Sequence, residues 1–377
     1  MNHVLSKVPQ SKCTGCFLCQ DICNKDAIKL ALDENGYYKP LVDESACVNC
    51  GLCSRKCPAI NDQRLIESFK PLAFSAWRSN LEEIKESSSG GIASILGELA
   101  IEKSWVVCGV KWKDGLPVYA IAETLEELKA FKGSKYLPPV ATGIYNEVKK
   151  NIQAGRNVLF IGLPCHIRAI KNHIFSPNLT TVDILCAGTP SMLLYQEYCK
   201  WKFKDQKVTS VNFRSKENGW RNSTIKFYSD NKVLFAEENY KNRFFLGFNS
   251  TLFYNEACYG CRFNTIPRIG DLTLGDFWGA SKEVDNHNGN SIVLVNTAKG
   301  MEIVKMLSPK HVCLNEIKVD KLISLNYRID QDYREMPKER KDALLMLGEK
   351  GFKKCSDKYF RPANFFEKLV AKIKRCI

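Results

Sequence analysis

The sequence predicts a small α+β domain over residues 1–62, a larger α/β domain over residues 70–320 and a basic tail over residues 321–377. Two observations support this prediction. A run of four cysteines with the spacing C-x2-C-x2-C-x3-C occurs twice in the first sixty residues. Beyond Lys70, short apolar runs that end at glycine or proline alternate with segments whose apolar residues recur at helical spacing. This alternation is typical of α/β proteins.

The duplicated cysteine spacing is that of bacterial two-cluster ferredoxins, in which the fourth cysteine of each run binds the cluster of the other run. We therefore predict a ferredoxin-like domain with two [4Fe–4S] clusters. A zinc site would normally use paired CxxC motifs instead of these triplets. Asn24 stands where a proline commonly follows the fourth cysteine, which leaves the prediction unchanged. The predicted ligands are Cys13, Cys16, Cys19 and Cys57 for the first cluster, and Cys47, Cys50, Cys53 and Cys23 for the second.

The overall composition favours a cytoplasmic redox protein. Seventeen cysteines in 377 residues indicate metal or redox chemistry more than disulfides. The N-terminus has no apolar h-region, and no apolar run approaches the ~18 residues of a membrane-spanning helix. The net charge is +14, but no nucleic-acid-binding motif accompanies it, so we expect no nucleic-acid partner.

Half of this charge lies in the tail, where the segment from Arg334 to Ile377 has 13 Lys/Arg and 6 Asp/Glu, a net +7. Residues 360–377 combine apolar residues at helical spacing with lysines on the other faces. This pattern predicts either a helix on an anionic membrane surface, at the inner face of the membrane, or a terminal helix packed on the protein. A basic tail also suits an acidic partner protein.

The first part of the α/β domain, residues 70–150, contains a glycine pair before a helical pattern. In SSSGGIAS, Gly90 and Gly91 precede apolar residues at helical spacing that begin at Ile92. Free backbone N–H groups at such a helix start can bind a phosphate, although a simple helix cap has the same pattern. There is no G-x-G-x-x-G motif, so a Rossmann nicotinamide site is not supported.

The second part, residues 151–320, contains four further cysteines that could share a site. Cys165 follows a predicted strand over residues 158–161, and Cys186 follows another over residues 182–185. If these strands are parallel neighbours, both cysteines lie at the same edge of the sheet, where α/β proteins bind ligands. Cys258 and Cys261, in CYGC, could complete a third [4Fe–4S] site. Buried structural cysteines and a thioredoxin-like CxxC motif are the alternatives.

Six motifs in register resemble those of one family. They are SSSGGIAS, FKGSKYL, GLPCHI, VDILCAGTPS, CYGCRF and IGDLTLGDFWG. In this order they are similar to the beta subunit family of coenzyme F420 hydrogenases and dehydrogenases, in the bacterial form with a fused ferredoxin domain. The resemblance runs from about residue 10 to about residue 300. His166 departs from it, because glutamine is common at that position.

The resemblance implies a flavin, usually FAD, beside a third [4Fe–4S] cluster bound by Cys165, Cys186, Cys258 and Cys261. In this interpretation glycines allow the backbone to approach the pyrophosphate, Lys135 offsets its charge and aromatic side chains cover the ring. Asp276 and Trp278 could equally form a structural turn. The implied flavin-site residues are Ser89, Gly90, Gly91, Gly133, Ser134, Lys135, Tyr136, Gly275, Asp276, Phe277 and Trp278.

We therefore expect an iron–sulfur flavoprotein oxidoreductase. Its clusters would exchange electrons with a redox partner protein, and its flavin would transfer hydride to or from a small-molecule substrate or a deazaflavin. The alternative is an electron-transfer subunit that docks onto a separate catalytic protein. The sequence identifies no catalytic acid or base. Cys108, in an apolar run, is expected in the core.

Overall fold

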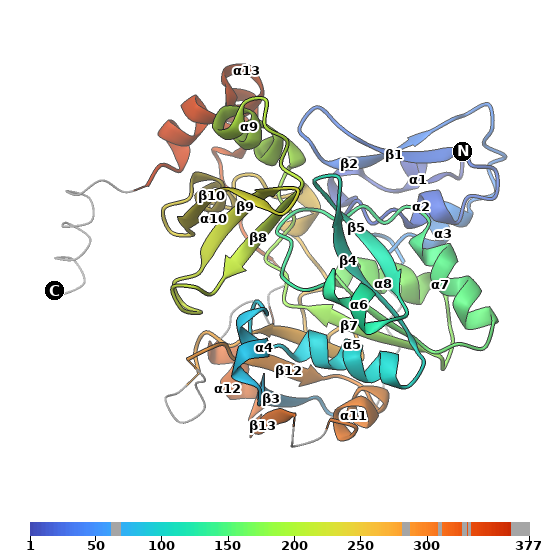
Figure 1. Ribbon diagram of the computed structural model, residues 1–377. Coiled ribbons are helices and arrows are strands. Elements are labelled where there is room, and N and C mark those ends of the chain that lie inside the picture. Colours follow the sequence, from blue (N-terminus) through green and yellow to red (C-terminus); the bar gives the residue numbers. More distant parts are fainter. Residues whose placement is uncertain (62–68, 281–286, 308–310, 326–329, 331–332, 363–377) are drawn as a thin grey trace.

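The computed structural model describes residues 1–61, 69–280, 287–307, 311–325, 330 and 333–362 (Figure 1). The N-terminal domain is a two-stranded antiparallel sheet, β1–β2, accompanied by short helices. Its two halves repeat one local structure, in which the third cysteine of each run lies in a helix that follows a left-handed residue. That residue is Phe17 (φ 66°) in the first half and Gly51 (φ 70°) in the second. The elements are α1 Val4–Lys7, η1 Gln10–Lys12, α2 Leu18–Asp21, β1 Ile28–Leu32, β2 Tyr38–Val42 and α3 Leu52–Lys56.

The α/β domain is built on a mixed sheet that has eight strands in the described residues, in the order β13-β3-β12-β11-β7-β6-β4-β5. Strands β4, β6, β7 and β11 are parallel to their neighbours within this group, and the outer pairs are antiparallel. Residues 70–150 and 151–320 thus both contribute strands to one sheet. The strands are β3 Leu72–Arg78, β4 Val106–Lys113, β5 Leu116–Ala122, β6 Val158–Gly162, β7 Leu179–Ile184, β11 Leu272–Asp276, β12 Ser291–Val295 and β13 Val312–Ile317.

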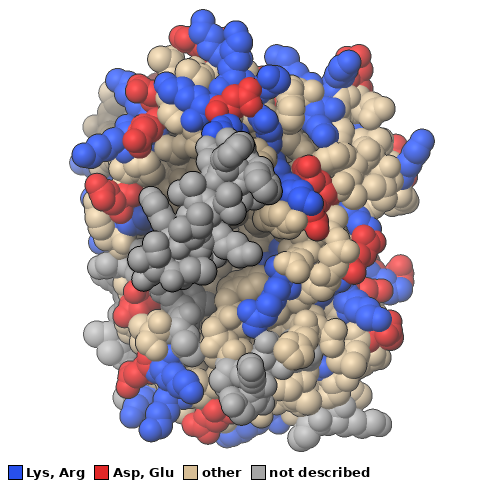
Figure 2. Space-filling model, turned by 90° about the vertical axis from the view of Figure 1, so that its left-hand side faces the viewer, with Lys and Arg blue, Asp and Glu red and all other residues tan. Residues whose placement is uncertain are grey.

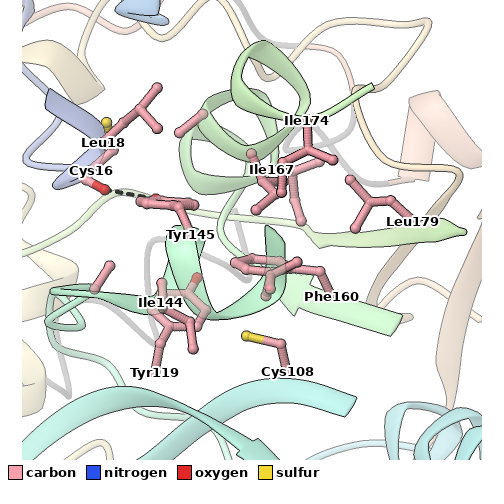
Figure 3. Close-up of a cluster of buried hydrophobic side chains, with 14 of the residues drawn as sticks. Cys16, Leu18, Cys108, Tyr119, Ile144, Tyr145, Phe160, Ile167, Ile174 and Leu179 are labelled. Atoms are coloured by element: carbon pink, nitrogen blue, oxygen red, sulfur yellow. Dashed lines mark hydrogen bonds between the residues drawn. The ribbon is translucent and has the colours of Figure 1, made fainter. Parts of the chain in front are cut away.

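Helices cover both faces of this sheet. Successive side chains of each strand point to opposite faces, and apolar side chains on both faces are buried under helices. Leu159 of β6 faces a core with α5 and α11, whereas Val158 and Phe160 face α7 and α8. The second core is continuous with the N-terminal domain, since Cys16, Phe17, Leu18 and Ile22 pack into it (Figure 3). Cys108 is fully buried there, as predicted. The helices are α4 Leu81–Lys85, α5 Ile92–Glu102, α6 Leu125–Lys129, α7 Ile144–Gln153, α8 Pro164–His173, α11 Ala298–Lys305 and α12 Val319–Leu325.

A third unit, which the sequence did not predict, is an antiparallel sheet of β8, β9 and β10 packed on α9, α10 and α13. Its core is rich in aromatic residues. Lys and Arg side chains gather over α9 and α13, at the top of the molecule in Figure 2. Most of the predicted tail helix, residues 363–377, lies outside the described residues. The elements are α9 Met192–Phe203, β8 Ser210–Ser215, β9 Thr224–Ser229, β10 Lys232–Glu238, α10 Arg243–Asn249, η2 Glu256–Cys258 and α13 Arg340–Tyr359.

The N-terminal domain is fixed to the rest of the molecule by polar contacts as well as by the shared core. The Asp21 carboxylate accepts hydrogen bonds from the N–H groups of Gly143 (2.6 Å) and Tyr145 (3.0 Å), which begin α7. The turn at Gly36 accepts a hydrogen bond from the N–H of Met192 at the start of α9 (2.8 Å). The N-terminal domain is therefore docked: it packs directly on the rest of the molecule and is not joined to it by a linker alone.

Candidate iron–sulfur sites and cofactor site

The first cysteine site is a cavity in the N-terminal domain. It is lined by the thiols of Cys13, Cys16, Cys19 and Cys57 and by apolar side chains such as Val4, Val8 and Leu30. Cys57 comes from the second run, so the structure brings together the crossed set that the ferredoxin spacing predicts. In the described part of the chain, no three His, Cys, Asp or Glu side chains are arranged to hold a single metal ion.

Burial disfavours deprotonation of these thiols. It raises the pKa of Cys16 to about 12 and that of Cys57 to about 11. Backbone N–H groups oppose this rise, from Leu18 to the sulfur of Cys16 and from Ala59 and Ile60 to that of Cys57. Four thiols on one cavity with N–H donors aimed at the sulfurs fit an iron–sulfur cluster, whose iron would supply the missing positive charge.

The second cysteine site lies closer to the surface. Cys53 lies within electrostatic reach of Cys23 and Cys50. Cys50 is exposed, whereas Cys53 is buried. Burial raises the pKa of Cys53, and N–H groups of Val4 and Ser54 oppose the rise. The exposed cysteine makes this site the more accessible of the two to another protein.

The third cysteine site is formed at the carboxyl ends of the parallel strands β6 and β7. Cys165 lies in the first turn of α8, directly after β6, and Cys186 follows β7. Both interact electrostatically with Cys258 and Cys261, so all four predicted cysteines converge. The CYGC segment begins at the end of a short 3-10 helix and opens no α-helix, unlike a thioredoxin-like motif.

The surroundings of the third site favour negative charge more than burial alone would allow. Burial raises the pKa of Cys186 to about 12 and that of Cys261 to about 11, while the positive charge of Arg268 opposes both shifts. The N–H of Thr189 donates to the Cys258 sulfur at 3.5 Å. Arg268 is itself held by the carbonyl of Ile184 at 3.2 Å. This set also fits an iron–sulfur cluster, and Arg268 was not singled out from the sequence.

The three segments predicted to line a flavin site converge, and residues that the sequence did not single out connect them. Arg214, at the end of β8, donates to the Asp276 carboxylate (2.7 Å) and to the Tyr136 hydroxyl (3.1 Å). Its guanidinium also lies over the Trp278 ring, at 4.9 Å from the centroid. The Nη2 atom of Arg214 is buried and has no hydrogen-bond partner among the described residues. A bound anion would supply one.

A pocket opens beside these segments. Lys85, Lys216, Glu217, Gly219, Trp220 and Asn288 line it. Lys216 donates to the carbonyls of Ser89 (2.6 Å) and Ile84 (2.8 Å), and burial lowers its pKa to about 7. The Trp220 ring stacks on Trp278 at 4.6 Å, with an angle of 1° between the ring planes. The buried Arg214 guanidinium beside the exposed Trp278 ring fits a phosphorylated aromatic cofactor.

Several predicted flavin-site residues have structural roles here. The three protons of the Lys135 ammonium have acceptors in the carbonyls of Ala130, Phe131 and Lys132, so Lys135 is tied to the backbone after α6. Burial lowers its pKa to about 7. Phe277 is 1% exposed and belongs to the core, so its ring cannot cover a cofactor.

The glycines and Asp276 also have defined places. The Gly90 N–H donates to the Ser291 hydroxyl (2.9 Å), and a Cβ there would lie 2.4 Å from the Ala76 carbonyl oxygen. Gly91 (φ 83°) caps the start of α5 in the left-handed conformation that glycine adopts easily. Asp276 ends strand β11, whereas Trp278 lies in the turn that follows, so the predicted structural turn is present at Trp278 only. Because the Gly90 N–H is already bonded to Ser291, it is not free to contact a phosphate.

The third site adjoins two of the segments predicted to line a flavin site. Gly275 packs so closely on Leu185, the residue before Cys186, that an added Cβ would lie 2.4 Å from the leucine side chain. Tyr136 and Cys258 pack against the same small cluster of Phe248, Tyr254 and Tyr259. The residues that could hold a cluster and those that could hold an aromatic cofactor thus share one wall.

Comparison with known proteins agrees with this arrangement. Residues 12–60 match the family model of the 4Fe-4S dicluster domain, and residues 155–319 match that of the C terminus of the coenzyme F420 hydrogenase/dehydrogenase beta subunit. These matches support an iron–sulfur electron-transfer oxidoreductase related to F420-dependent enzymes. These two matched regions are similar to the coenzyme F420 hydrogenase/dehydrogenase beta subunit family and to dicluster ferredoxin domains, which confirms the resemblance predicted from the motifs.

Individual relatives cover different parts of the chain. It is 24% identical over 324 residues to the coenzyme F420-dependent sulfite reductase of Methanocaldococcus jannaschii. That match covers 82% of this chain and 48% of the reductase, so the chain spans about half the length of this relative. An uncharacterized ferredoxin of the same organism is 39% identical over 64 residues, 17% of this chain and 79% of the ferredoxin. A chain of the F420-reducing [NiFe] hydrogenase complex from Methanosarcina barkeri matches with a TM-score of 0.48 and 18% identity, over 69% of this chain and 89% of that chain.

Proposed function

We propose that this protein is an iron–sulfur flavoenzyme that exchanges single electrons with a redox partner protein and hydride with a deazaflavin of the coenzyme F420 type. The arrangement of the sites in series is the main support. The first cysteine site adjoins the third, because Cys165 interacts electrostatically with Cys16. The third site in turn packs against the same aromatic cluster as Tyr136, whose hydroxyl accepts a hydrogen bond from Arg214.

In this proposal, some residues of the chain bind the cofactors and others exclude water from the space between them. Three sets of four cysteines would each hold a [4Fe–4S] cluster, with the exposed Cys50 marking the entry or exit point for electrons. Arg214 and Lys216 would hold the phosphates of FAD, and Trp278 would lie against its ring. A bound flavin would supply the exchange between one-electron and two-electron chemistry. The core around Tyr145 keeps water from the path between the sites.

The deazaflavin is proposed from the names of the matching family and of the sulfite reductase relative. That relative is about twice as long, and the part without a counterpart here leaves room for a catalytic module. This favours a second role, in which the chain delivers electrons to a separate catalytic protein. We propose that it works in the cytoplasm in either role. Among the described residues, no helix is both long and apolar enough to cross a membrane.

Anaerobic reduction of the isolated full-length protein by reduced coenzyme F420 tests the proposal. The iron–sulfur absorbance should bleach while oxidised coenzyme appears, without any partner protein. Reduced nicotinamides serve as the matched comparison and should react more slowly. Bleaching by nicotinamides alone would contradict the deazaflavin proposal. Protein that contains iron but no flavin after gentle purification, and takes up none, would contradict the flavin.

A further inference from the structure

The wall between the first and third cysteine sites contains a buried hydrogen-bonded pair, Tyr145 and His166. The Tyr145 hydroxyl lies 2.7 Å from the carbonyl oxygen of Cys16 (Figure 3). It also lies 3.1 Å from Nδ1 of His166. A carbonyl oxygen only accepts, so the hydroxyl donates its proton to Cys16 and accepts from Nδ1–H of His166. Because His166 follows Cys165 in the chain, this pair connects a cysteine of one site to a cysteine of the other.

The pair is closed off from solvent. Tyr145 is fully buried and His166 is 2% exposed. The Phe160 ring stacks on Tyr145 with 6.3 Å between centroids, and the Tyr119 ring lies 5.1 Å from the imidazole. These aromatic side chains fill the space between α7, α8 and the sheet, so the two sites are separated by packed protein.

A second connection lies on the other side of the same interface. Asn255 donates from Nδ2 to the carbonyl oxygen of Cys13, at 3.2 Å. Its own carbonyl accepts from the N–H of Cys258 at 2.8 Å, and its N–H donates to the carbonyl of Thr189 at 2.9 Å. Two cysteines of the first site, Cys13 and Cys16, are thus each held by a residue adjacent to the third site.

We propose that the Tyr145–His166 pair is the electron path between the ferredoxin domain and the α/β domain, and that Asn255 fixes its length. This inference rests on the proposed function. One electron leaves the group bound by one set of cysteines and enters the group bound by the other, and no proton or bond is exchanged. The second site, with its exposed Cys50, then exchanges electrons with the partner, and the first site passes them inward.

The test uses full-length, anaerobically reconstituted protein and the variant Tyr145→Phe, which keeps the ring and removes the bridging hydroxyl. Tyr198→Phe is the matched control, because Tyr198 is equally buried and hydrogen-bonded, to Asn242, in a different core. Rapid mixing with dithionite, followed at the iron–sulfur bands, gives the rate at which the inner cluster is reduced. Tyr145→Phe should slow it roughly tenfold or more, and Tyr198→Phe should not. Electron paramagnetic resonance of reduced protein should show a weaker magnetic interaction between the first and third clusters.

His166 supplies an independent pair of variants. His166→Gln keeps an N–H donor and should behave like wild type, whereas His166→Leu should behave like Tyr145→Phe. Unchanged rates and unchanged magnetic coupling in Tyr145→Phe and His166→Leu, with all iron retained, would overturn the path. Wild-type protein with only about eight irons per chain would instead overturn the third cluster, and with it the proposed function.

Discussion

Replacing Cys13 and Cys57 together should remove no more iron than replacing either one alone. They belong to different cysteine runs, yet both line the cavity that also contains Cys16 and Cys19. Three sites of four cysteines correspond to about twelve irons per chain, and loss of one ligand empties one site. Cys13→Ser, Cys57→Ser and the double variant should therefore each retain about eight irons. Cys13→Ser combined with Cys53→Ser affects two sites and should retain about four.

Iron and acid-labile sulfide per chain, measured on anaerobically purified full-length protein, give these counts directly. Cys199→Ser is the control, because Cys199 lies in α9 outside the three cysteine sites and should leave the count unchanged. Circular dichroism establishes that each variant remains folded. The reasoning is refuted if Cys13→Ser/Cys57→Ser retains only about four irons, as Cys13→Ser/Cys53→Ser does, because each run would then hold its own cluster.

Three further predictions follow from single residues. Arg214→Gln should weaken flavin binding about 10- to 100-fold, because it removes a charged hydrogen-bond donor, and equal loss of iron would contradict this assignment. Gly36→Ala should lower the free energy of unfolding in urea by about 1–3 kcal/mol more than Gly155→Ala. Both glycines have positive φ (78° and 80°), but only at Gly36 would a Cβ clash, 2.3 Å from the N atom of Leu193. For Lys135, burial lowers the pKa from 10.5 to about 7. Between these pH values its side chain is therefore protonated in the unfolded chain but mostly neutral in the folded protein. Stability should rise with pH across that window, and Lys135→Met should reduce the slope in urea titrations at pH 7 and 9.

The grouping of cysteines into sites could be predicted because it depends on spacing and strand patterns within short segments of the sequence. The duplicated spacing specifies the crossed ligand set, and the structure indeed brings Cys57 to the cavity of the first run. Cys165 and Cys186 each follow an apolar strand, and parallel strands end at the same edge of a sheet. The start of α5 was likewise marked by Gly91 before an apolar helical pattern.

The cofactor pocket was predictable only in part, because tertiary packing decides which side chains face it. Arg214 and Lys216 lie at the edge of a three-stranded sheet whose position depends on its packing against an aromatic core. No sequence motif indicates that position. Lys135 lies in a predicted segment, but the free carbonyls after α6 hold its ammonium. Phe17 adopts the left-handed conformation that Gly51 has in the other half, which burial of its ring offsets.

The docking of the ferredoxin domain favours electron transfer within one molecule. Phe17, Leu18 and Ile22 share a core with α7 and α8, and Asp21 caps α7, so removing residues 1–61 would expose apolar surface and destabilise the α/β domain. A fixed interface also makes the distance between the first and third sites independent of protein concentration, unlike that between separate proteins. Reduction of the inner cluster, once the outer ones are reduced, should therefore show the same rate at tenfold different protein concentrations. A rate that increases with concentration would mean that electrons cross between molecules and that the docked domain is not the donor.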